Sequence, residues 1–112
     1  MARGVRRVLP RARVTLLPIS DGGDGLMETL LASAGGRRRF SWVRGPLGRS
    51  RRAPYALLDD GTAVVEMAQA SGLARIPVHK RDVLAATSWG TGDLIRSAVA
   101  KGAKTVVVGL GG

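Results

Sequence analysis

The sequence RVTLLPISDGGDG, at residues 13–25, joins a short apolar run to a glycine-rich loop. Residues 13–19 are rich in strand-forming side chains without polar alternation, which predicts a strand buried on both faces. Residues 20–25 have the composition of a loop. The apolar residues of 26–34 then recur at helical spacing, and two glycines follow as a helix stop. This part of the chain therefore predicts a strand, a glycine-rich loop and a helix.

The residues before the apolar run are basic and include no acid. Val5, Val8, Leu9 and Ala12 recur at helical spacing within residues 1–14. This predicts the last turns of a helix, because a strand pattern follows at once. A basic, acid-free start is also typical of an organelle transit peptide, so both interpretations stay open.

The middle of the chain has strand patterning. Phe40 and Trp42 alternate with their neighbours, as in a strand with one covered face, and we expect both rings to pack. A Gly-Pro-Leu-Gly turn follows at residues 45–48. Residues 55–58 and 62–68 predict two more strands, and the Asp-Asp-Gly between them is a strong hairpin signal.

The last part of the chain returns to alternating helix and strand. After residues 69–90, expected to be loop or short helix, Thr91 is predicted to cap a helix that ends at Gly102. Its predicted buried stripe is Leu94, Ile95, Ala98 and Val99. Residues 105–108 predict a buried strand, and the glycine-rich end after it normally leads into another helix, which suggests truncation there. The expected class is α/β with a mixed sheet.

The composition excludes several classes of protein. The 112 residues contain no cysteine, so disulfides and thiolate metal sites cannot form, as is typical of a reducing cytoplasm. One histidine cannot build a histidine metal cluster, and no apolar run approaches the roughly 20 residues that span a bilayer. We therefore expect a cytoplasmic protein with no membrane partner and no protein-made metal site.

Positive charge is concentrated in the first half. The net charge is +10, and residues 1–52 hold twelve arginines against three acids. Such a basic half could bind nucleic acid, with Arg37-Arg38-Arg39 on phosphates and Phe40 stacked on a base. We interpret it first as a solvated basic surface with no specific nucleic acid partner. A basic nucleic-acid-binding module is the alternative.

Three segments could carry chemistry. Asp21, with Gly22 and Gly23, follows a predicted strand and precedes a helix, where ligands bind in open α/β sheets; a capped tight turn is the alternative. Residues 87–93, TSWGTGD, offer hydroxyls, glycines and a helix N-terminus for an anion, or form an ordinary helix start. Glu66 is an acid in an apolar strand, which either faces solvent or belongs to a site.

Taken together, these segments resemble the bacterial-type glycerate kinase family. They occur in the family's order and spacing across nearly the whole chain. The matching segments are PISDGGDG at 18–25, GPLG at 45–48, VEMAQASGL at 65–73, KRD at 80–82, TSWGTGDLI at 87–95 and VGLGG at 108–112.

The resemblance implies a two-domain α/β kinase, with one domain inserted into a Rossmann-like one and the active site between them. On that plan, residues 1–36 are a partial Rossmann-like domain and residues 37–112 a partial inserted domain. The implied reaction moves the γ-phosphoryl group of ATP to a hydroxyl of D-glycerate, with Mg²⁺ present. The resemblance favours 2-phosphoglycerate as the product.

The resemblance also assigns site residues and sets a limit. It implies a catalytic role for Asp21 and substrate or phosphate contacts for the following set: Gly22, Gly23, Glu66, Ser71, Ser88, Gly90 and Thr91. The family's first strand with its loop, and the loop after the final glycines, have no counterpart in these 112 residues. We therefore expect an internal, inactive fragment of a kinase, and a degenerate gene product is a further interpretation.

Overall fold

The structure is a computed structural model that describes residues 2–16 and 19–111. Its centre is a four-stranded sheet in the order β1-β2-β3-β4, formed by Arg37–Arg44, Ser50–Leu57, Thr62–Glu66 and Thr105–Gly109. β1, β2 and β3 are antiparallel neighbours, whereas β4 runs parallel to β3. The predicted α/β class with a mixed sheet is confirmed.

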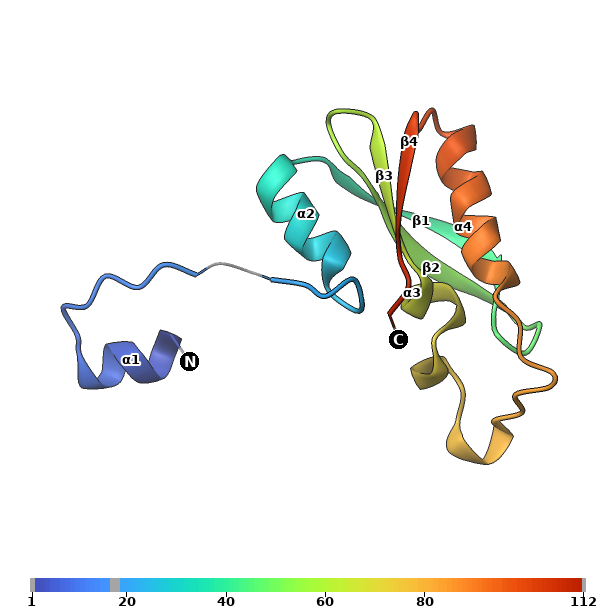
Figure 1. The fold of residues 1–112 in the computed structure, drawn as a ribbon, viewed down its shortest axis with the longest axis horizontal. Coiled ribbons are helices and arrows are strands. Elements are labelled where there is room, and N and C mark those ends of the chain that lie inside the picture. Colours follow the sequence, from blue (N-terminus) through green and yellow to red (C-terminus); the bar gives the residue numbers. More distant parts are fainter. Residues whose placement is uncertain (1, 17–18, 112) are drawn as a thin grey trace.

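Helices cover both faces of this sheet (Figure 1). α4, Trp89–Ala100, packs Leu94 and Ala98 against Val43, Tyr55 and Val65. On the opposite face, α2, Leu26–Ala34, packs Met27 against Ala56, Leu58 and Val64. Because strand side chains alternate between faces, odd-numbered residues of β1, β2 and β3 face α4 and even-numbered ones face the α2 side. In β4 the numbering is reversed, since Val106 is the register partner of Ala63 and packs on the α4 side.

Both predicted turns are present. The chain reverses at residues 45–48, where the amide of Gly48 donates to the carbonyl of Gly45 at 2.9 Å. The Asp-Asp-Gly turn closes the β2–β3 hairpin, where the amide of Leu58 donates to the carbonyl of Thr62 at 2.8 Å. The strands differ from the predicted bounds, because β2 begins at Ser50 and β3 ends at Glu66.

Short helical segments connect β3 to α4, as expected for residues 69–90. α3, Met67–Ser71, begins directly after Glu66. Two single 3₁₀ turns follow it, η1 at Leu73–Arg75 and η2 at Val78–Lys80.

The strand predicted at residues 13–19 is wrong for the residues that the structure describes. Residues 13–16 and 19 are not in a strand, Leu16 is 70% exposed and Ile19 is 91% exposed. α1, Ala2–Val8, precedes them and has no buried residue, and this arm runs away from the sheet (Figure 1). An apolar run becomes a strand only where a neighbour completes its hydrogen bonds, and within residues 2–16 and 19–111 no strand pairs with residues 13–16. The rest of this prediction, Leu17 and Pro18, lies outside the described residues.

Several predicted burials are also wrong. Phe40 and Trp42 are 47% and 71% exposed, because α2 packs on β2 and β3 and leaves their part of the β1 face uncovered. β4 is an edge strand, so Val107 is 39% exposed instead of buried on both faces. Val99 is 54% exposed because it lies outside the α4 stripe that meets the sheet.

Candidate functional site

The carboxyl ends of the parallel strands β3 and β4 meet at one edge of the sheet. β3 ends at Glu66 and β4 at Gly109, and these two residues are register partners. α2 begins at the same edge, because Gly25 and Met27 at its start contact Glu66. Ligand sites of open α/β sheets form at such an edge.

Glu66 is a buried carboxylate, only 2% exposed, that binds the start of α2. Its Oε1 accepts hydrogen bonds from the amides of Gly25, at 3.0 Å, and Met27, at 2.8 Å. Helix N-terminal amides lack partners within the helix, and a negative charge there is stabilised by the helix dipole. The interpretation of Glu66 as a solvent-facing acid is therefore wrong, and the contact explains why the residues of 20–25 are held near the sheet.

Asp21 lies in the exposed loop before α2. Its Oδ1 accepts a hydrogen bond from the amide of Gly23 at 3.0 Å, which is a local turn contact. Ser20 makes the equivalent bond to the amide of Gly22 at 3.2 Å. The second carboxylate oxygen of Asp21 has no hydrogen bond among the described residues, so the turn leaves it available to a ligand.

The two glycine-rich segments lie against each other at this edge. The amide of Gly111 donates to the carbonyl of Gly22 at 3.3 Å. A Cβ atom at Gly109 would lie 2.4 Å from that carbonyl oxygen, and one at Gly111 would lie 2.5 Å from the Cα of Gly23. Only glycine allows this approach, so the structure brings Gly22 and Gly23 together with residues 109–111.

Gln69 joins the acids of this region, although the sequence pattern did not mark it as a site residue. Its Nε2 donates to Asp24 Oδ1 at 3.0 Å and to Glu66 Oε2 at 3.1 Å, while its Oε1 accepts from Arg75 at 2.6 Å. The signal for Gln69 was its place three residues after Glu66, on the first turn of α3.

Ser71 and Thr91 form a second group. Their hydroxyl oxygens lie 3.0 Å apart, at the end of α3 and the start of α4. Thr91 does not cap α4 as predicted, because the helix begins two residues earlier, at Trp89, with Ser88 preceding it. Gly90 lies against β1, where a Cβ atom would be 2.0 Å from the carbonyl oxygen of Arg44. α3 connects this group to Glu66.

Asp93 is buried and forms an ion pair with the half-exposed Arg44. Its carboxylate accepts from the backbone amide of Arg44 at 3.0 Å and from the Arg44 side chain at 2.9 and 2.8 Å. Hydrogen bonds from Arg44 lower the pKa of Asp93 to about 2. The pair ties α4 to the end of β1, which is a structural role.

The basic runs lie largely at the surface. Arg37, Arg38 and Arg39 are exposed on β1, where Arg38 forms an ion pair with Glu28. The Arg52 guanidinium lies 4.3 Å from the centre of the Phe40 ring. These contacts fit a solvated basic surface in which an arginine covers an aromatic ring.

Among residues 2–16 and 19–111, no three His, Asp or Glu side chains gather in a metal-binding arrangement. Glu66 and Asp24 are already bonded to amides and to Gln69. Glu66 Oε1 and Asp24 Oδ1 therefore already have partners within the protein. In the same described part of the chain, no helix has the length and apolar character needed to cross a bilayer.

Comparison with known proteins gives a consistent result. Glycerate 2-kinase of Escherichia coli K12 is 44% identical over 111 residues, and glycerate kinase of Bacillus subtilis 168 is 45% identical over 111 residues. Each match covers 98% of this chain but 29% of the relative, so the chain spans less than a third of the curated relatives it matches. A crystal structure from Salmonella typhimurium LT2, assigned as a glycerate kinase 2, superposes with a TM-score of 0.81 at 43% identity. That match covers 99% of this chain and 30% of the other. The model of the glycerate kinase family matches residues 1–112 in full, and the chain belongs to that family.

Proposed function

We propose that the protein acts as an ATP-dependent D-glycerate kinase and that this chain supplies one side of its active site. The observation that carries the proposal is the meeting of two glycine-rich segments, residues 22–23 and 109–111, at the carboxyl ends of β3 and β4. Backbone without side chains lets a phosphate or a small acid approach closely. The glycerate kinase relatives support the reaction class.

Asp21 is the proposed catalytic residue. Its carboxylate would accept the proton of the glycerate hydroxyl as that oxygen forms a bond to the γ-phosphorus of ATP and the bond to the ADP oxygen breaks. The local turn supports this role, because it holds one carboxylate oxygen on the amide of Gly23 and leaves the other available. Such transfer depends mainly on positioning and on neutralising charge.

The remaining site residues are proposed to position substrate. Gly22 and Gly23 admit the phosphoryl group, while the exposed Ser88 offers its hydroxyl to an anion at the start of α4. Gly90 and Thr91 are buried beside it and hold that helix start in place. Ser71 supports Thr91 through their hydroxyl contact. Glu66 acts on the loop through its bonds to Gly25 and Met27, and its burial argues against direct contact with glycerate.

Several wider features belong to the same proposal. They are ATP as the phosphoryl donor, Mg²⁺ as its companion ion, 2-phosphoglycerate as the product, a cytoplasmic location, and a domain division near residue 36. No cluster of three acids lies among the described residues, and the ligands of the ion are not assigned to this chain.

The test is a kinase assay of the full-length protein that carries this chain, with ATP and D-glycerate. We expect ADP and phosphoglycerate in equal amounts, and phosphorus NMR of the product distinguishes the 2-isomer from the 3-isomer. L-Glycerate and glycerol serve as control acceptors. ADP formation that does not depend on D-glycerate would reject the function, and sequence-selective oligonucleotide binding at physiological salt would favour the nucleic-acid alternative.

A further inference from the structure

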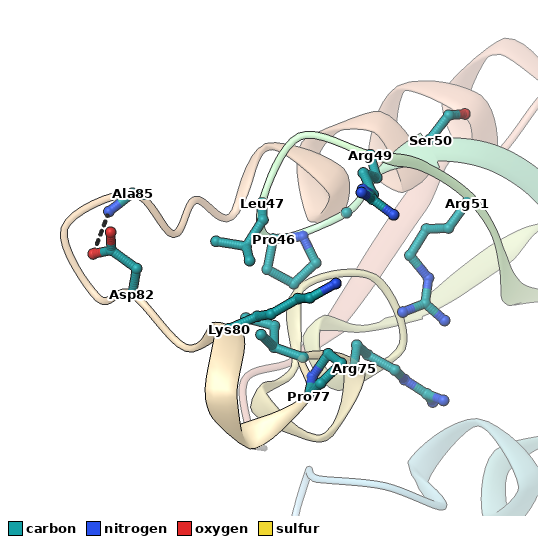
Figure 2. Close-up of a pocket in the computed structure, with 12 residues that line it drawn as sticks. Pro46, Leu47, Arg49, Ser50, Arg51, Arg75, Pro77, Lys80, Asp82 and Ala85 are labelled. Carbon is teal, nitrogen blue, oxygen red and sulfur yellow. Dashed lines mark hydrogen bonds between the residues drawn. The ribbon is translucent and has the colours of Figure 1, made fainter.

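A pocket of about 720 Å³ lies between the β1–β2 turn and the segment around η1 and η2. Figure 2 shows Pro46 and Leu47 of the turn facing Pro77 and Lys80 across this space. Its volume falls in the range of small-molecule sites, about 300–1,000 Å³. None of its lining residues is a site candidate of the proposed kinase reaction.

The pocket carries an excess of positive charge. Its lining includes Arg49, Arg51, Arg75 and Lys80 but only one acid, Asp82. Asp82 Oδ1 accepts from the amides of Leu84, at 2.9 Å, and Ala85, at 3.2 Å, and among the described residues no ion pair joins Asp82 to any of the four cations. Four cations against one acid leave the lining with a net positive charge.

Arg51 is the clearest sign of a missing partner. Its Nε is buried and has no hydrogen-bond partner among the described residues. Burial and the nearby positive charge of Arg75 lower the pKa of Arg51. A buried donor without a partner is rare and costly in folded proteins. In Figure 2 the Lys80 side chain also points toward Arg51, so two cations share one space.

The remaining wall is apolar. Pro46, Leu47, Ile76, Pro77 and Ala85 provide carbon surface beside the charged groups. An arginine fork matches the oxygens of a phosphate or carboxylate, and apolar walls suit a carbon body attached to it. We propose that this pocket binds a small organic anion that bears a phosphate or carboxylate group, with Arg51 and Lys80 as its main contacts.

This site goes beyond the proposed kinase function, since it is separate from the glycine-rich segments. One hydrogen-bonded path connects the two regions: Arg75 donates to Gln69, which in turn donates to Asp24 and Glu66. The pocket therefore lies next to the loop of residues 20–25, and it shares no lining residue with that loop.

The test measures binding of inorganic phosphate and of acetate to the full-length protein by calorimetry at constant ionic strength. Arg51→Met should weaken phosphate binding at least fivefold. Arg52→Met is the matched control, because Arg52 is the next residue of β2 and lies over Phe40, and it should change binding less than twofold. Acetate binding that responds to Arg51→Met would identify a carboxylate ligand, and a response of phosphate alone would identify a phosphate ligand.

Folding of the variant needs its own check. We expect Arg51→Met to unfold at the same temperature or higher, since it removes a partly buried cation without a partner. Lys80→Met, at an exposed position, gives a second variant that should also weaken binding. Absent phosphate and acetate binding, or equal affinity in all variants, would overturn the proposal, as would an acidic segment of the same protein filling the pocket. Because glycerate phosphorylation is assayed separately, failure here would leave the kinase proposal intact.

Discussion

At the level of single residues, Asp21 and Asp24 share one loop but have different partners. Asp21 bonds only to the amide of Gly23 within its own turn. Asp21→Asn keeps a carbonyl oxygen for that bond but cannot accept a proton from glycerate. We expect glycerate-dependent turnover of the full-length protein to fall about 100-fold or more, with little change in melting temperature. Steady-state kinetics and thermal unfolding of the same preparation measure the two effects.

Asp24 provides the control for that substitution. Its Oδ1 accepts from Gln69, and Asp24→Asn can keep this bond, so turnover should change only a few-fold. Near-normal turnover of Asp21→Asn would remove Asp21 from the site. Equal losses in both variants would instead point to a general effect of the loop charge.

Glu66 is expected to act on stability through the loop. Glu66→Gln keeps an oxygen for the amides of Gly25 and Met27 but loses the charge, and its amide group then faces the amide of Gln69. The free energy of unfolding should fall by about 1–3 kcal/mol. Urea denaturation measures the change, and Asp60→Asn, at an exposed turn acceptor for Thr62, should cost clearly less. Equal losses in the free energy of unfolding for the two variants would show that the buried Glu66 stabilises the fold no more than an exposed turn acid does.

At the level of elements, α4 contains two glycines with opposite expected responses. A Cβ atom at Gly90 would lie 2.0 Å from the carbonyl oxygen of Arg44, whereas nothing lies within 4 Å of one at Gly92. Gly90→Ala should push α4 from β1 and cost about 1–3 kcal/mol. Gly92→Ala should gain about 0.5–1 kcal/mol, because alanine favours a helix. Thermal unfolding shows whether each variant is more or less stable than the unchanged protein. A Gly90→Ala variant with unchanged stability would contradict the close packing of Gly90 on β1.

The α4–β1 junction should also respond to acid. The pKa of Asp93 is lowered from 3.8 to about 2 by hydrogen bonds from Arg44. As the pH falls, the unfolded chain takes up a proton on Asp93 at a higher pH than the folded protein does. The contribution of the Asp93–Arg44 pair to the free energy of unfolding is therefore complete above about pH 4 and is lost as the pH falls to 2. Urea denaturation at several pH values measures the free energy of unfolding of the unchanged protein and of Asp93→Asn. The difference between the two should shrink between pH 4 and pH 2. Asp59→Asn, at an exposed turn position, is the control, and a constant advantage would contradict the assignment.

The sequence predicted correctly those elements that are determined by residues close together in the chain. α2 and the β2–β3 hairpin have their apolar spacing, glycine stop and Asp-Gly turn within a few neighbouring residues, and both are present. The faces of β1 and the edge position of β4 depend on which helix lies above them, so Phe40 and Val107 were predicted wrongly. Asp21, Gly22 and Gly23 were identifiable as a loop, but the contact of Glu66 with residues about 40 positions away was not.

At the scale of the whole molecule, the described parts leave much apolar surface uncovered. β4 pairs on one side only, with β3. The arm before the sheet carries Val8 at 79% and Leu9 at 59% exposure. An open strand edge and exposed apolar side chains favour association between copies of the chain. A strand paired with the free edge of β4 would satisfy its open hydrogen-bonding groups. A surface packed on Val8 and Leu9 would bury their apolar side chains.

The last prediction is that residues 1–112 expressed alone will fold poorly and will not phosphorylate glycerate. The unpaired edge of β4 invites aggregation, and a domain has only about 5–15 kcal/mol of net stability to lose. Phosphoryl transfer also requires nucleotide and glycerate to be held in line, and the proposed site here comprises one loop with its glycine-rich neighbour.

The measurements are heat-induced unfolding, light scattering and ATP-dependent glycerate phosphorylation, with the full-length protein as the positive control. We expect a broad transition, aggregation and no activity. A folded but inactive chain would contradict only the stability part of the prediction. A cooperative, monomeric and active chain would refute both parts, because it would show that this segment organises a complete active site by itself.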